Sequence, residues 1–97
     1  MTPAQLKSSA ASDPKPATRL SPEAKVLWFI KRGDWEAAHG IAQDIATPTG
    51  FWLHAMLHLI EGDLGNARYW FVEAGRPVKK PSQIEELWDE IAEELLK

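Results

Sequence analysis

Residues 51–77, FWLHAMLHLIEGDLGNARYWFVEAGRP, decide the fold of this chain. Apolar side chains occupy almost every position from about Thr49 to Glu61, which predicts a helix enclosed by its neighbours. Gly62-Asp63 ends this helix, and Asp63 is suited to cap the next one, Leu64 to Ala74. Gly75 and the proline that follows it stop the second helix. The stretch therefore predicts an antiparallel helical hairpin.

A related hairpin is predicted upstream. Ser21-Pro22-Glu23 is a helix start, with Ser as the N-cap and Pro at the first helical position, and the helix runs to about Arg32. Gly33-Asp34 then separates it from a helix from Trp35 to about Ala46. Gly33 to Ala38 matches Gly62 to Ala67 at an offset of 29 residues. Inside the second helix, Gly40 costs about 1 kcal/mol relative to Ala, so we expect it to mark close helix packing.

The C-terminal segment predicts one more helix. Ser82 and Glu85 form a capping box, and apolar residues then recur at helical spacing as Ile84, Leu87, Trp88, Ile91, Ala92 and Leu95. Six acidic residues fall largely off this stripe and predict a solvated face. An alternative is that this helix mediates homodimerisation.

Together these elements predict an all-α fold. We expect one domain over residues 21–97, with five helices: two antiparallel hairpins resembling tetratricopeptide repeats, and a C-terminal amphipathic helix that caps them. Residues 1–20 contain Pro3, Pro14 and Pro16 and few apolar side chains, so we expect a disordered leader.

The motif HAxLHxxEGDxxNAxYWFxxAGRP, from His54 to Pro77, resembles the one found in a family of small, mostly bacterial helical proteins of uncharacterised function. Leu59 departs from this pattern where a basic residue is expected, and Phe71 where Tyr is more common. Ala67, Phe71 and Ala74 also resemble the second helix of a tetratricopeptide repeat. The resemblance implies the helical fold and implies no activity.

Composition and charge exclude several classes of function. The net charge is −3, with ten basic against eight acidic residues before position 81 and one against six from there on, so no dense basic patch favours nucleic acid. The longest apolar run, residues 51–60, is too short to cross a bilayer and carries two histidines. The chain has no cysteine and no apparent secretory signal, so we expect a cytoplasmic protein.

One cluster of residues could carry chemistry. His54 and His58 are four apart and Glu61 is three further on, so a helix projects all three within one sector. Such a pair of histidines can chelate a divalent metal, with Glu61 or His39 as a third ligand. Ala55 follows His54 where a zinc protease motif needs Glu, so that type of hydrolysis is not predicted.

Two other interpretations of this cluster stay open. The first is a buried polar network within the core, formed by His39, Asp44, His54, His58, Asn66, Tyr69 and Arg76. The second is acid–base catalysis by a histidine. The five tryptophans, one in each predicted helix, are interpreted first as core residues.

The leading functional hypothesis is a non-enzymatic protein-interaction module that binds a protein partner or a second copy of itself, with no resident cofactor. The rival is a small metal-binding or histidine-based enzyme that uses His39, His54, His58 and Glu61.

Overall fold

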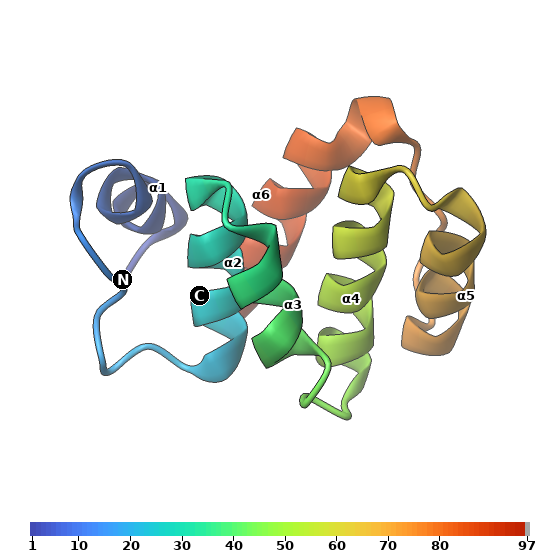
Figure 1. The fold of residues 1–97 in the computed structure, drawn as a ribbon, viewed down its shortest axis with the longest axis horizontal. Helices are drawn as coiled ribbons and strands as arrows, with labels where there is room; N and C mark the ends of the chain where they lie inside the picture. The colour runs from blue at the N-terminus through green and yellow to red at the C-terminus, as the bar shows by residue number, and fades with distance from the viewer. Residues whose placement is uncertain (97) are drawn as a thin grey trace.

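A computed structural model describes residues 1–96 and confirms the all-α class. Those residues contain no β-strand. The helices are α1 (Pro3–Ser12), α2 (Pro22–Arg32), α3 (Trp35–Ala42), α4 (Pro48–Glu61), α5 (Leu64–Ala74), the short 3-10 helix η1 (Pro81–Gln83) and α6 (Ile84–Leu95) (Figure 1). Lys97, the last residue of the expected domain, lies outside the described residues.

Two helical hairpins with the same turn chemistry form the body of the protein. Gly33 ends α2 and Gly62 ends α4, both in the left-handed conformation, with φ of 89° and 85°. An Asp follows each glycine and caps the next helix: Asp34 accepts from the backbone N–H of Ala37, and Asp63 from that of Asn66, both at 3.2 Å. These turns fold α2 back on α3 and α4 back on α5, and α3 then packs against α4.

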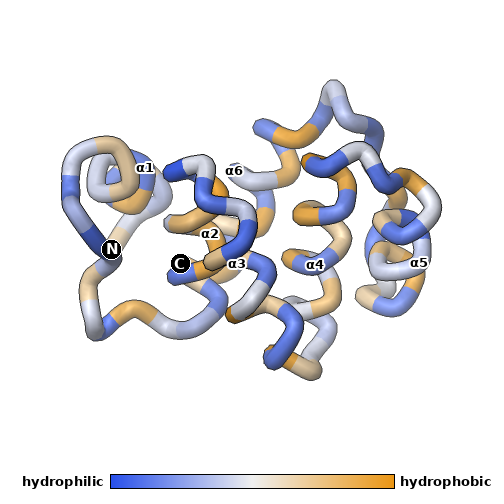
Figure 2. The backbone as a smooth tube through the Cα atoms, viewed as in Figure 1, coloured by the Kyte–Doolittle hydropathy of each residue, from blue (hydrophilic) through white to orange (hydrophobic). Residues whose placement is uncertain are grey.

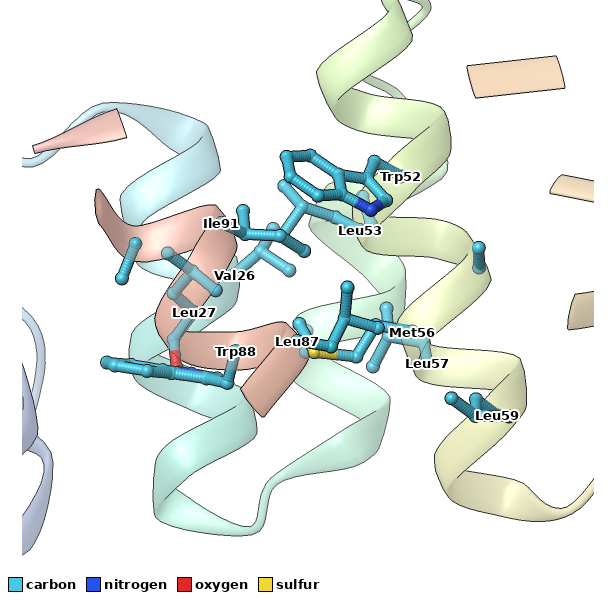
Figure 3. Packing of buried hydrophobic residues seen from close by; sticks show 14 of the residues in the cluster. Val26, Leu27, Trp52, Leu53, Met56, Leu57, Leu59, Leu87, Trp88 and Ile91 are labelled. Carbon is cyan, nitrogen blue, oxygen red and sulfur yellow. The ribbon is translucent and has the colours of Figure 1, made fainter. Parts of the chain in front are cut away.

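The core lies where α2, α4 and α6 meet (Figure 3). Helix α4 is buried on nearly all sides, and hydrophobic residues recur along it between hydrophilic ones (Figure 2). Helix α6 contributes Leu87, Trp88 and Ile91, and the indole N–H of Trp88 donates to the carbonyl of Leu27 at 2.9 Å. The centre of the apolar stripe of α6 is therefore part of the core, and its two ends, Ile84 and Leu95, are partly buried.

Helix α1 corrects the expected disordered leader and the expected count of five helices. Leu6 and Ala10 are buried against the rest of the chain, where α1 contacts α2 and α6. The indole N–H of Trp28 donates to Ser9 Oγ at 3.0 Å, and Arg32 donates to the carbonyls of Ala10 and Asp13. The prolines do not prevent this helix, because Pro3 lies in its first turn and the other two follow its end.

The glycine with a closely packed neighbour is Gly50, which lies against the turn that precedes α4, and the expectation for Gly40 is wrong. Helix α3 ends at Ala42, earlier than expected, and the chain turns through Ile45 before α4 begins. A Cβ on Gly50 would lie 1.9 Å from the carbonyl oxygen of Ile45, whereas one on Gly40 would have nothing within 4 Å. Among residues 1–96, no helix has the length and apolar character needed to cross a membrane.

Candidate functional site

The three histidines meet on the line where the two hairpins touch. His39 lies on α3, and His54 and His58 lie one turn apart on α4. The indole N–H of Trp35 donates to the carbonyl of Leu57 at 2.8 Å and holds α3 against α4 at this level. The helical spacing of His54 and His58 and the packing of α3 on α4 thus bring all three rings together.

The ring nitrogens of the three histidines converge, and those of His39 and His54 are the pair in closest contact. His39 Nε2 and His54 Nε2 are 3.2 Å apart. The rings of His54 and His58 stack with centroids 4.8 Å apart, and the ring of His39 lies 5.6 Å from that of His58. One nitrogen from each histidine lies within 4.8 Å of the other two. Tetrahedral zinc with Zn–N distances of about 2.0–2.1 Å requires nitrogens roughly 3.3–3.4 Å apart, close to the His39–His54 separation.

Two tryptophans bracket this histidine cluster, which we define as His39, His54 and His58. The ring of Trp35 stacks on His39, with centroids 4.7 Å apart and planes 9° from parallel. The ring of Trp70 stacks on His54 at 4.3 Å and 12°. Three of the five tryptophans are fully buried core residues, as expected, but these two instead fix the orientation of histidine rings.

Glu61 has a different position from the one predicted for a ligand. Its Oε1 is 2.5 Å from Nδ1 of His58, one turn back on α4. A carboxylate at Nδ1 holds the proton on that nitrogen, so Nε2 keeps the lone pair that can bind a metal. Glu61 is therefore placed to orient His58, and His39 is placed as the third nitrogen donor.

The electrostatics of the cluster favour the neutral form of His54. Burial first, and then the neighbouring His58 and His39, lower the pKa of His54 from 6.5 to about 4, while Glu61 acts in the opposite direction. His54 is 9 % exposed and His58 8 %. A neutral imidazole is the form that coordinates a metal, so His54 is ready to bind at neutral pH without first losing a proton.

The remaining members of the predicted polar network lie elsewhere. Asn66 bonds to the carboxylate of Asp63, and Tyr69 donates to Glu73 at 3.3 Å. Arg76 pairs with Glu94 at 2.7 Å and lies over the ring of Trp52. Asp44 is exposed in the turn between α3 and α4. The structure thus brings together His39, His54, His58 and Glu61 and leaves the other four side chains outside the cluster.

A second group of potential ligands shares one residue with the cluster. Atoms of His58, Glu61 and Asp63 also lie within 4.8 Å of one another. In this group the two acids are exposed, and Asp63 already caps α5. The histidine cluster is the more enclosed of the two and has only nitrogen donors.

Comparisons with models of protein families, with curated proteins and with solved structures find no match for this chain. The site must therefore be interpreted from its own chemistry. Sequence reasoning did not identify Trp35 and Trp70 as ring partners of the histidines. For Trp35 a signal was present, because Trp35 and His39 are four apart on a helix and face the same side. No spacing along the chain predicts the contact between Trp70 and His54, which depends on how α5 packs on α4.

Proposed function

We propose that this protein binds a divalent transition metal through His39, His54 and His58. The observation that supports the proposal best is the convergence of one nitrogen from each histidine within 4.8 Å. Imidazole nitrogens suit zinc, copper and nickel better than magnesium or calcium, which prefer oxygen ligands. Zinc is the simplest candidate, because three histidines and one further ligand complete its usual four-coordinate shell.

The surroundings of the cluster support a preorganised site. Trp35 and Trp70 restrict the rings of His39 and His54, and Glu61 restricts the ring of His58. Such outer contacts strengthen metal binding because the ligands lose less freedom when the metal arrives. Metal binding would join α3 to α4 and so link the two hairpins. We propose no reaction at the site, because no general base accompanies the histidines in the manner of a zinc protease.

Direct titration tests the proposal. Protein without a histidine tag, stripped of metal with a chelator, is titrated with Zn²⁺ in competition with a chromophoric chelator at pH 7.5. We expect one equivalent to bind and to change the fluorescence of the stacked tryptophans. His39→Gln, His54→Gln and His58→Gln should each weaken binding by about 10-fold or more. Circular dichroism on each variant separates loss of a ligand from loss of fold.

A matched variant distinguishes the two groups of ligands. Asp63→Asn keeps an effective helix cap but removes a carboxylate from the His58–Glu61–Asp63 group. Zinc affinity should be unchanged if the histidine cluster holds the metal. A strong loss of zinc affinity in Asp63→Asn would show that the His58–Glu61–Asp63 group binds the metal instead. If no stoichiometric zinc binds and the melting temperature does not rise, the metal proposal is wrong, because a ligand of the native state must stabilise it.

We also propose, as a second function, the interaction module predicted from the tetratricopeptide-like hairpins. A specific observation favours it. Helix α5 lies at the end of the molecule opposite α1 (Figure 1), and it leaves apolar side chains exposed. Leu64 is 54 % exposed and Val72 65 %. Helix α5 packs chiefly against α4, so its outer face is available to a partner. Whether the partner is another protein or a second copy, and whether the protein is cytoplasmic, stay predictions.

A further inference from the structure

A groove runs between α5 and the extended segment of residues 78–80, with Pro81 of η1 at its end. It has a volume of about 340 Å³. Leu64, Ala67 and Arg68 line it from α5, and Val78, Lys79 and Lys80 line it from the extended segment. It lies on α5 and does not include the histidine cluster, so it is a separate feature of the molecule.

The groove has an apolar interior. Its lining includes Leu59 and Ala67, which are 2 % and 1 % exposed and form the floor. Leu64 and Val78 lie on its two sides and are 54 % and 48 % exposed. An aliphatic side chain placed between Leu64 and Val78 would remove both from water, at about 25 cal/mol for each Å² of apolar surface covered.

Basic residues line the same groove. Arg68, Lys79 and Lys80 contribute to it, and no acidic residue does so within the described range 1–96. Lys79 is 3.8 Å from Glu90, at the outer limit for an ion pair. Neither Arg68 nor Lys80 forms an ion pair with another residue between positions 1 and 96. In a chain whose net charge is −3, this is a local positive surface around an apolar centre.

We propose that the groove binds an acidic, leucine-containing segment of a partner protein. A leucine of that segment would sit between Leu64 and Val78, and flanking carboxylates would meet Arg68 and Lys80. Charge complementarity selects this occupant, because the positive charges of Arg68, Lys79 and Lys80 attract carboxylates. A nucleic acid fits less well, since it would leave the apolar floor uncovered and meet only three cations. The small area predicts weak, transient binding. This inference deepens the proposed interaction module and is independent of the metal.

The probe is a synthetic peptide of twelve residues in which leucines alternate with pairs of glutamates, labelled with fluorescein. Fluorescence anisotropy should show saturable binding that weakens as salt rises. Nitrogen–proton NMR spectra should show shifts concentrated in residues 64–68 and 78–81. Two control peptides, one with lysine for each glutamate and one with serine for each leucine, should not bind. If the acidic peptide fails to bind at millimolar concentration, the proposal is wrong.

Surface variants locate the contact. Leu64→Ser and the double variant Arg68→Glu/Lys80→Glu should each weaken peptide binding by about tenfold or more. Ile60→Ser is the matched control: Ile60, at the end of α4, is also an exposed aliphatic residue but does not line the groove, so binding should be unchanged. Equal losses in the control would overturn the assignment.

Sedimentation of the unliganded protein tests the other occupant. Self-association that Arg68→Glu/Lys80→Glu abolishes would show that a second copy fills the groove, and would overturn the proposal of a separate partner. A monomer at all concentrations is expected. All measurements are repeated with a chelator and with zinc. If the protein binds zinc but not the acidic peptide, the proposal for the groove is wrong. If it binds the peptide but not zinc, the proposal for the metal site is wrong.

Discussion

At the scale of single residues, His54 makes stability depend on pH. Its pKa is about 4 in the folded protein, because of burial and then of His58 and His39 nearby, against 6.5 as the ordinary value. Between these pH values the unfolded chain binds a proton that the folded chain does not. In metal-free protein we expect the stabilisation present above pH 6.5 to be lost as pH falls toward 4, by ~3 kcal/mol in all.

Urea unfolding between pH 4 and 7.5 measures this effect. Carboxylates also titrate in that range, so the informative quantity is the difference in unfolding free energy between the wild type and His54→Gln. The groups that face His54 are His39 from α3 and His58 and Glu61 from α4, and all three are retained in the variant. The difference should narrow as the solution is acidified. Two parallel curves would contradict the prediction.

Glu61 gives a second prediction at this scale. Because its carboxylate holds Nδ1 of His58, Glu61→Gln should weaken zinc binding by roughly 10–100-fold without removing a ligand. Glu73→Gln is the control, since Glu73 is also an exposed helical acid but bonds to Tyr69. Competition titration with a chromophoric chelator compares the two. Equal affinities would show that Glu61 does not orient the site.

At the scale of the helices, two glycines are expected to respond in opposite directions to the same substitution. Gly50→Ala places a Cβ against the backbone of Ile45 and should destabilise the protein by roughly 1–3 kcal/mol. Gly40→Ala meets nothing and should stabilise α3 by about 1 kcal/mol, because Ala is the better helix former. Thermal unfolding of both variants checks the signs. Destabilisation by Gly40→Ala would show that α3 packs more closely there than described.

The helices also show what the sequence could predict. Local signals predicted α2 to α6: helical spacing of apolar residues, and a Gly-Asp turn used twice. Helix α1 was missed because only two apolar residues on it, Leu6 and Ala10, are buried, which is too few to give a clear helical period. The hydrogen bonds that hold it come from Trp28 and Arg32, far along the chain. A local signal was also present, because Thr2 and Gln5 form a capping box and Pro3 occupies the first turn.

In the candidate site, too, some contacts follow from local helical spacing and others depend on how the helices pack. That His54, His58 and Glu61 share one side of α4 follows from helical geometry alone. That His39 joins them depends on how α3 packs on α4, which periodicity along one helix does not fix. Tyr69 was misplaced for the same reason, because it points to solvent from α5 while its neighbour Trp70 turns toward His54.

At the scale of the whole molecule, α6 holds the hairpins together. It contacts both α2 and α4, and an ion pair of 2.7 Å between Lys7 and Asp89 joins it to α1. Leu87, Trp88 and Ile91 of α6 are fully buried within the chain, whereas Ile84 and Leu95 are partly buried. This position is the one expected of a helix that caps the two hairpins.

A chain that ends at Pro81 should therefore be unfolded rather than a folded monomer. It loses Leu87, Trp88 and Ile91, and truncating a single large core side chain already costs about 3–5 kcal/mol against a typical total of about 5–15 kcal/mol. Circular dichroism and gel filtration of the shortened chain test this. In the full chain, Trp88→Ala should cost about 3–5 kcal/mol, whereas Glu86→Ala, at an exposed position of α6, should change stability by less than about 0.5 kcal/mol. A cooperatively folded chain of residues 1–81 would return α6 to the role of an interface helix.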